Sequence, residues 1–231
     1  MEVSPYYEKK LECIHCKKTF STYKVRTKSI KVKDTDTDFM PIYEDENVRA
    51  MYYNVFVCEH CGFSYTEDFT KYFAPGTAEE VKEKITKNWV HHDFNGERTV
   101  FQALHAYKLA LLCADIKREK NVTKAGLALR LAWLYRSLKN AQQEERFLTI
   151  ARDQYIESYS NEDYATTQMS GTRVVYMIAE LSRRVKDYEN AVRYFSKVIE
   201  GQRTGGEAKL VEMARERWEE IRTEREAQAQ V

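Results

Sequence analysis

Four cysteines form two short motifs with the spacing of metal ligands, CIHC at Cys13–Cys16 and CEHC at Cys58–Cys61. A Cys-x-x-Cys turn directs two thiolates at one ion, and two such turns complete a tetrahedron. We therefore predict one zinc ion bound by Cys13, Cys16, Cys58 and Cys61. Because four thiolates leave no coordination position for water or substrate, this zinc is expected to be structural. Rubredoxin-type iron uses similar turns, so iron is the alternative metal.

The other residues near these motifs that could ligate a metal are expected to have different roles. His15 and His60 lie between the paired cysteines, where side chains normally point out of the turn. Cys113 lies in the apolar stretch LALLCADI, with no neighbour that would lower the pKa of its thiol. We expect Cys113 to be a small buried side chain rather than a nucleophile.

A second set of residues combines arginines with aromatic rings in the C-terminal part of the chain. Such pairs suit an acidic segment or a peptide carboxylate, through bidentate hydrogen bonds and stacking. We predict a concave helical surface that binds a protein or peptide partner and contains Arg130, Trp133, Arg136, Arg173, Tyr176, Arg183 and Arg184. The alternative is that some of these residues pair with glutamate or aspartate side chains on neighbouring helices, for instance Glu144, Glu145 or Glu180.

Charge changes sign abruptly in the N-terminal part. Residues 17–33 contain seven basic side chains and no acid, whereas residues 34–46 contain six acids and no base. Lys24, Arg26 and Lys28 alternate along a predicted strand face that could contact the phosphates of a nucleic acid. The opposing interpretation is that the basic strand and the acidic loop neutralise each other.

The acidic run imitates the start of a calcium-binding loop without completing one. Asp34, Asp36 and Asp38 have the spacing of the first three ligands. However, Phe39 stands where such a loop requires glycine, and Asp45 stands where it requires a bidentate glutamate. We therefore reject a calcium site of this type.

An enzyme is the least favoured class of function. The sequence contains no GxxxxGK[ST], GxGxxG or GxSxG motif. His91, His92 and Glu97 could be imagined as an acid/base cluster, but they have no adjacent nucleophile and lack the HExxH spacing. We expect a surface or loop-packing role for these residues.

The composition indicates a soluble protein without a strong overall field. The chain of 231 residues has 37 basic and 36 acidic side chains, so its net charge favours neither nucleic acid nor an anionic membrane. No apolar run reaches the roughly 18 residues that a membrane-spanning helix needs. The N-terminal sequence MEVSPYYEKKLE lacks the apolar core of a signal peptide, so we expect a cytoplasmic location.

The elements that must position these residues divide the chain into two predicted domains. Residues 1–76 contain strand-like sequence and are expected to form a small β zinc ribbon. Residues 77–231 show helical periodicity and predict a mainly α domain of tetratricopeptide-like hairpins. The expected helices span residues 78–91, 98–118, 122–138, 141–159, 165–185, 188–201 and 206–227.

Several of these segments together resemble an uncharacterised bacterial family, domain of unknown function 2225. The resemblance rests on CIHCKKTF, DTDTDFMPIY, YYNVFVCEHCGFSY, AYKLALLC, LRLAWLYR and IAELSRRVKDYENAVRYFSKVI. Family members usually carry proline after the first cysteine of each motif, where this chain has Ile14 and Glu59. The resemblance implies a zinc ribbon followed by tetratricopeptide-like helices, and it implies no activity.

These observations favour a non-enzymatic cytoplasmic adaptor. It would bind a protein or peptide, acidic in character, on its helical surface, while zinc holds the N-terminal module together. The alternative is a protein that associates with nucleic acid through the basic face of the ribbon.

Overall fold

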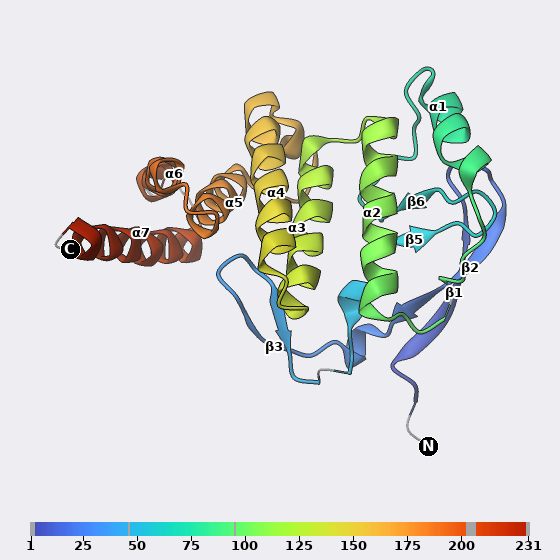
Figure 1. The fold of residues 1–231 in the computed structure, drawn as a ribbon, viewed down its shortest axis with the longest axis horizontal. Helices are drawn as coiled ribbons and strands as arrows, with labels where there is room; N and C mark the ends of the chain where they lie inside the picture. The colour runs from blue at the N-terminus through green and yellow to red at the C-terminus, as the bar shows by residue number, and fades with distance from the viewer. Residues whose placement is uncertain (1–2, 46, 95, 202–206, 230–231) are drawn as a thin grey trace. The chain divides into compact units, whose positions relative to one another are not determined.

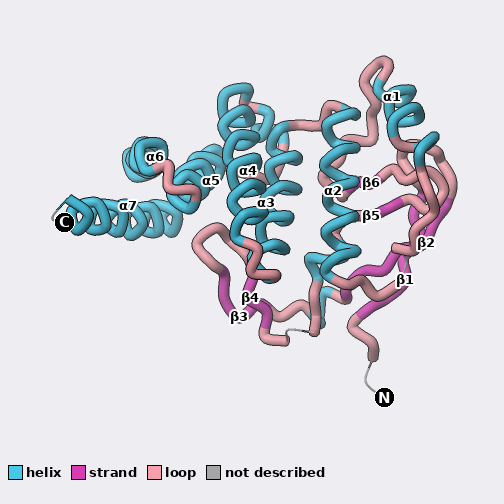
Figure 2. The backbone as a smooth tube through the Cα atoms, viewed as in Figure 1, coloured by secondary structure: helices cyan, strands magenta, loops and turns pink. Residues whose placement is uncertain are grey.

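The computed structural model describes residues 3–45, 47–94, 96–201 and 207–229 (Figure 1). Within them, the strands form three separate antiparallel hairpins, in which β1 pairs with β2, β3 with β4 and β5 with β6 (Figure 2). The strands are β1 (Tyr6–Glu12), β2 (Thr19–Val25), β3 (Val32–Thr35), β4 (Pro41–Tyr43), β5 (Phe56–Val57) and β6 (Ser64–Tyr65). The cysteine motifs lie in the turns of the first and third hairpins.

Helices make up most of the described chain after the strands. The α-helices are α1 (Thr77–Lys84), α2 (Val100–Lys117), α3 (Asn121–Ser137), α4 (Ala141–Asn161), α5 (Gly171–Arg184), α6 (Tyr188–Glu200) and α7 (Ala208–Ala229). Short 3-10 helices are η1 (Thr27–Ser29), η2 (Ala50–Tyr53), η3 (Thr86–Asn88) and η4 (Asp163–Thr166). The predicted fold, mainly α with small N-terminal β hairpins that carry four cysteines, is confirmed.

Two of the predicted helices are shorter than expected. The first ends at Lys84, and a 3-10 turn follows it. The fifth begins only at Gly171, because the Ser170 hydroxyl accepts a hydrogen bond from the Arg173 N–H at 3.1 Å and so caps the helix there. Residue 206, where the last helix is predicted to begin, lies outside the described residues.

The chain groups into two compact units whose limits differ from those of the predicted domains. Unit 1 comprises Met1–Thr35 and Pro41–Glu119, and unit 2 comprises Asp36–Met40 and Lys120–Val231. The predicted boundary after residue 76 falls inside unit 1, because α1 packs with α2 and α2 packs on the β5–β6 hairpin. The chain therefore enters unit 2 briefly between β3 and β4 and returns to it after α2.

A buried arginine joins the loops of unit 1. Arg98 donates from Nη1 to the carbonyls of Tyr52 (2.9 Å) and Val55 (2.8 Å), and from Nε to that of Phe94 (3.1 Å). Its backbone N–H donates to the Tyr53 hydroxyl at 3.0 Å. Burial lowers the pKa of Arg98 to about 10, so the side chain is still charged at neutral pH. These bonds hold the approach to β5 and thus the second cysteine motif.

A buried ion pair closes the C-terminal end of α2. Lys117 Nζ lies 2.5 Å from Glu119 Oε1, and both side chains are 1% exposed. The ammonium group also donates to the Thr70 hydroxyl (2.6 Å) and to the Tyr72 carbonyl (2.7 Å). The pair therefore fixes the segment that follows β6 against α2.

Replacing Lys117 by methionine is expected to destabilise unit 1 by about 3–5 kcal/mol, because the Glu119 carboxylate then stays buried without its cation. Urea unfolding followed by circular dichroism measures the change. The control Lys82→Met removes an exposed charge from α1 and is expected to change the free energy of unfolding by less than about 0.5 kcal/mol. Equal stabilities of the two variants would contradict this role for the pair.

Unit 2 consists of two helical hairpins and a final helix. In it α3 packs on α4, α5 packs on α4 and α6, and α7 packs on α5 and α6 (Figure 1). Small side chains at these crossings, among them Ala132, Ala151, Ala179 and Ala191, are fully buried. They let the helices approach closely, as the tetratricopeptide-like spacing predicts.

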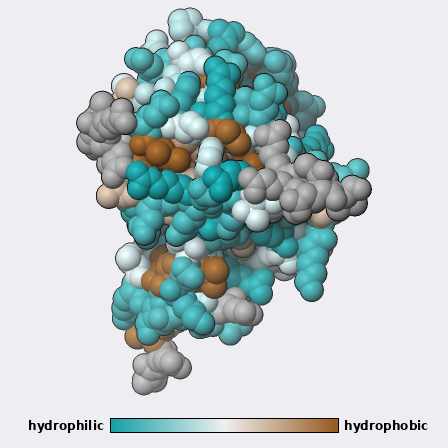
Figure 3. Space-filling view, turned by 90° about the vertical axis from the view of Figure 1, so that its left-hand side faces the viewer, coloured by the Kyte–Doolittle hydropathy of each residue, from teal (hydrophilic) through white to brown (hydrophobic). Residues whose placement is uncertain are grey.

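The face of the molecule that Figure 3 shows is largely polar. In the view of Figure 3 most side chains are hydrophilic, and hydrophobic ones gather in small patches between them. Charged residues make up 32% of the sequence, which accounts for this coverage. None of the helices in the described ranges combines the length and the apolar character that crossing a bilayer requires.

Candidate functional site

The two cysteine motifs form hairpin turns of the same geometry. CIHC lies between β1 and β2, and CEHC lies between β5 and β6. The first cysteine of each motif donates its N–H to the carbonyl five residues later, Cys13 to Lys18 and Cys58 to Phe63, both at 3.0 Å. Two unrelated segments of the chain thus present their thiols in the same way.

The four sulfur atoms have the spacing of a tetrahedral metal site. Cys13 Sγ lies 3.8 Å from Cys61 Sγ, and Cys16 Sγ lies 3.7 Å from Cys58 Sγ. All four atoms lie within 4.8 Å of one another. Since metal–sulfur bonds of about 2.3 Å give a tetrahedron with edges of about 3.8 Å, the four thiols fit one metal ion.

The electrostatics of the cluster favour a cation at its centre. Hydrogen bonds from Cys58 and then Cys61 lower the pKa of Cys13 to about 4, although its burial acts in the opposite direction. Hydrogen bonds to Cys13 and then Cys58, together with burial, raise the pKa of Cys61. Because a divalent cation stabilises every thiolate at once, binding it would release the remaining protons.

The histidines of the two motifs bond to backbone carbonyls instead of joining the cluster. His15 Nε2 lies 3.2 Å from the Ala78 carbonyl, and His60 Nε2 lies 3.0 Å from the Thr19 carbonyl. Across the part of the chain that the structure describes, the four cysteines are the one group of ligating side chains close enough together to hold a metal ion. Both imidazole rings therefore brace the turns from outside.

Cys113 has the environment expected of an inert thiol. It is fully buried on α2, and its sulfur accepts a hydrogen bond from the Ser64 N–H at 3.4 Å. Burial raises the pKa of Cys113 to about 12. A thiol that stays protonated at neutral pH is a poor nucleophile.

A tryptophan outside the motifs supports the second turn. Trp89 Nε1 donates to the Glu59 carbonyl at 2.7 Å. Its ring lies against Gly62, where an added Cβ would come within 2.4 Å of a ring carbon. Gly62 also has a φ of 72°, in the left-handed region that favours glycine. The sequence gives no signal for this role of Trp89, because tryptophan is not a metal ligand and this residue lies far along the chain from both motifs.

Gly62→Ala is expected to weaken metal binding and to destabilise unit 1, because the new Cβ displaces both the turn and Trp89. Backbone strain of this kind costs about 1–3 kcal/mol. Competition with a chromophoric chelator measures the metal affinity, and thermal unfolding measures the stability. Gly96→Ala is the matched control, since its added Cβ meets no described neighbour within 4 Å. If both variants behave like the wild type, the contact between Gly62 and Trp89 has no such role.

Residues Asp36–Met40, named the acidic tip, form a tight turn between β3 and β4. The Asp36 N–H donates to the Met40 carbonyl at 2.9 Å, and the Phe39 N–H donates to the Asp36 carbonyl at 2.8 Å. Phe39 has a φ of 66°, in the left-handed region. The acidic tip belongs to unit 2, where its side chains meet α3 and α5.

Asp38 is the most enclosed residue of the acidic tip. Its side chain is 0% exposed, and Oδ2 accepts hydrogen bonds from Arg136 Nη2 at 2.7 Å and from Trp133 Nε1 at 3.0 Å. Arg136 is held in turn by Glu144, with Nε 2.6 Å from Oε1. Burial opposes the charge of Arg136, but Asp38 and then Glu144 raise its pKa, so the guanidinium keeps its charge.

Asp36 joins α3 to α5 within unit 2. It accepts a hydrogen bond from Arg136 Nη1 at 2.9 Å and one from Arg184 Nη2 at 2.7 Å. Burial alone would raise the pKa of Asp36, but Arg184, the Thr37 N–H and Arg136 together hold it below its usual value. The Asp36 carboxylate is therefore ionised at neutral pH and is committed to arginines.

The rest of the acidic tip makes polar and aromatic contacts with α5. The Thr37 carbonyl accepts from the Tyr176 hydroxyl at 2.9 Å, and the Thr37 hydroxyl donates to Glu180 at 2.5 Å. The Phe39 ring packs on the Tyr176 ring, with 5.6 Å between centroids. The Arg173 guanidinium lies over the Phe39 ring, 4.2 Å from its centroid.

Five of the seven residues predicted to bind a partner surround the acidic tip. These five are named the arginine–aromatic surface and are Trp133, Arg136, Arg173, Tyr176 and Arg184. Of the other two, Arg130 donates to the Gly126 carbonyl at 3.0 Å, and Arg183 donates twice to Glu180 at 2.8 Å. Pairing with glutamates, the alternative interpretation, also occurs, because Arg136 binds Glu144 and Arg184 binds Glu180. Binding of a separate partner stays a prediction.

The three basic residues of the nucleic-acid alternative do not form the predicted row on one strand face. β2 ends before Arg26, so of the three only Lys24 lies in the strand, while Lys28 lies in η1. Lys24 Nζ lies 2.6 Å from Glu67 Oε1, and Arg26 Nε donates to the Ser4 carbonyl at 3.1 Å. Two of the three charges thus have partners inside unit 1.

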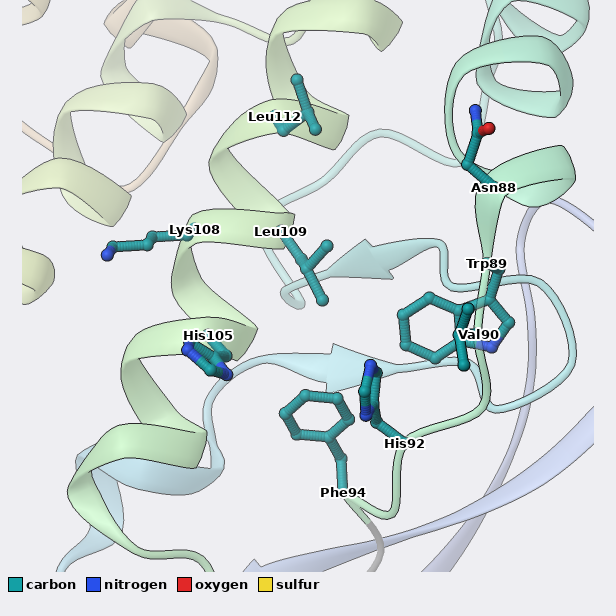
Figure 4. Close-up of a pocket in the computed structure, with 9 residues that line it drawn as sticks. All are labelled: Asn88, Trp89, Val90, His92, Phe94, His105, Lys108, Leu109 and Leu112. Carbon is teal, nitrogen blue, oxygen red and sulfur yellow. The ribbon is translucent and has the colours of Figure 1, made fainter.

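A cavity of about 440 Å³ lies in unit 1 between α2 and the segment after η3. Its lining residues are Asn88, Trp89, Val90, His92, Phe94, His105, Lys108, Leu109 and Leu112 (Figure 4). In Figure 4, Lys108 extends away from Trp89 and Phe94. The described lining includes His92 but neither His91 nor Glu97, and it holds no carboxylate, thiol or hydroxyl. The imagined acid/base cluster is therefore not assembled at this cavity.

A family model described as an uncharacterized protein conserved in bacteria (DUF2225) matches residues 6–221. The chain belongs to this family. The matched range of the DUF2225 family includes both cysteine motifs, the acidic tip and the arginine–aromatic surface. No curated protein and no solved structure matches this DUF2225 chain.

Proposed function

We propose that the protein is a non-enzymatic adaptor that holds one structural zinc and binds an acidic segment of a partner protein on its arginine–aromatic surface. The observation that carries this proposal is the acidic tip itself, which is an acidic peptide bound at that surface. Arginines that bind two carboxylates and an aromatic ring in one segment can bind the same pattern in another chain.

The chemistry of the cysteine cluster supports zinc in a structural role. Tetrahedral sites with four thiolates are typical of structural zinc, and they leave no open position for a reacting group. The cluster lies where two short hairpins meet, so metal-binding energy acts as folding energy for unit 1.

Removing the metal is expected to unfold unit 1 and to leave most of unit 2 helical. Cys58→Ser should abolish stoichiometric zinc binding, because it removes one of the four ligands. Circular dichroism should then lose the contribution of α1 and α2 and keep that of α3 to α7. Metal analysis of the purified wild type should give one zinc per chain. If the purified protein is red and contains iron, the site binds iron and not zinc. Loss of nearly all helical signal in Cys58→Ser would contradict the separation into units.

The charges of the arginine–aromatic surface support an acidic partner. Arg136 and Arg184 each bind a carboxylate of the acidic tip, and Arg173 covers its aromatic ring. Such bidentate and stacked contacts discriminate strongly between arginine and lysine and between carboxylate and amide. A segment with two acids and an adjacent aromatic residue therefore meets these requirements best.

The proposal is tested with a labelled peptide of residues 33–43 and a full-length receptor in which the acidic tip is disabled by Asp36→Asn and Asp38→Asn. Fluorescence anisotropy should show saturable binding that weakens as salt increases. A peptide with Asp36→Asn and Asp38→Asn should bind at least about tenfold more weakly, because it lacks the carboxylates that the arginines hold.

A matched control separates the effect of those two carboxylates on binding from the effect of the peptide's net charge. The peptide with Asp34→Asn loses one charge of the same run, yet in the structure Asp34 is exposed and bonds to its neighbour Thr35. It should bind like the parent peptide. Adding Arg136→Gln to the receptor should abolish binding. A folded receptor that binds no peptide up to about 1 mM would overturn the proposed function.

A further inference from the structure

We infer that the acidic tip is a tethered competitor for the partner site, and that the partner carries the same pattern, Asp-x-Asp followed by an aromatic residue. The partner segment exchanges with the acidic tip on the arginine–aromatic surface. This inference rests on the function proposed above and adds its ligand pattern and its regulation.

The pattern follows from how each position of the acidic tip is read. The first acid, Asp36, accepts from two arginines, Arg136 and Arg184. The second acid, Asp38, accepts from an indole as well as from Arg136 and is completely enclosed. The aromatic position, Phe39, is held between a tyrosine ring and a guanidinium. Three of four consecutive positions therefore have specific partners.

The position between the two acids has a milder requirement. The Thr37 carbonyl is a backbone group that every residue supplies, and it accepts from Tyr176. The Thr37 hydroxyl lies between Glu180 and Arg184, at 2.5 Å and 2.7 Å. A serine or threonine in the partner can make both contacts, whereas an acid at this position would face the Glu180 carboxylate.

The way in which the acidic tip is attached suits exchange. It is carried by β3 and β4, which pair only with each other among the described strands. Every residue of β3 is exposed, so these strands add little to a hydrophobic core. The contacts of the acidic tip with α3 and α5 are hydrogen bonds, ion pairs and the packing of the Phe39 ring.

The energetics of exchange are close to balanced. A buried ion pair contributes little net stability relative to the same two charges in water. Leaving a buried arginine without its carboxylate, however, is costly. Exchange avoids that cost, because each arginine regains a carboxylate from the partner. What favours the bound acidic tip is its tether, which keeps it at an effective concentration that a free partner must exceed.

The test compares the peptide of residues 33–43 on three full-length receptors: the wild type, the Asp36→Asn/Asp38→Asn variant and the control Asp34→Asn. Self-occupation lowers apparent affinity by the fraction of molecules whose surface is free. We expect the wild type and Asp34→Asn to bind at least about tenfold more weakly than the double variant.

Hydrogen exchange on the wild type provides a measurement that needs no variant. Saturating peptide should increase exchange of the amides of residues 36–40 by at least about fivefold, because the acidic tip is released. The peptide with Asp36→Asn and Asp38→Asn should leave that exchange unchanged. A fixed structural turn would show no such change.

The outcomes separate this inference from the proposed function. Equal affinity of the wild type and the double variant, with unchanged exchange of the acidic tip, overturns the tethered competitor and leaves the adaptor in place. Equal binding of the peptide with and without its two acids overturns the ligand pattern. Absence of binding to every folded receptor, together with unchanged exchange, overturns both proposals.

Discussion

Four thiolates within 4.8 Å of one another repel each other unless a cation lies among them, and unit 1 depends on this constraint. The strands β5 and β6 have two residues each, and so short a hairpin is not stable alone. The cysteine cluster joins it to β1 and β2, while Trp89, Arg98 and the pair Lys117–Glu119 hold the surrounding loops. Polar contacts and the four-cysteine cluster thus have, in unit 1, the stabilising role that a larger apolar core has in other domains.

In unit 2 the charges that lie close together are positive. Its helices α3 and α5 place arginines close together, and Glu180, which is fully buried on α5, needs their charge. The acidic tip adds the carboxylates of Asp36 and Asp38 to those that the helices supply through Glu144 and Glu180. Charge balance in unit 2 is therefore completed by a segment from the N-terminal part of the chain, and this is why the segment Asp36–Met40 belongs to a unit otherwise made of residues after 119.

The features that could be predicted from the sequence are those with local signals. Cys13 and Cys16 are close in sequence, as are Cys58 and Cys61, and helical periodicity marks α2, α3, α4 and α6 within a few residues. The partner of Asp36 has no local signal, because Arg136 lies 100 residues away and Arg184 lies 148 residues away. The arginines and the acidic run each stand out in the sequence, but 37 basic side chains offer too many possible pairings for composition to choose among them. The contact of Trp89 with Gly62 also has no local signal, because an aromatic ring that packs on a glycine leaves no periodic pattern in the sequence.

The distance of the acidic tip from its helices along the chain also has a consequence during translation. Arg136 is made 100 residues after Asp36, which takes about 5–20 s at a ribosomal rate of about 5–20 residues per second. Through that interval the acids of the newly made segment cannot pair with these arginines, because the arginines have not yet been made. In each newly made chain this segment is therefore unpaired at first, and it can complete its ion pairs only after α5 has been made.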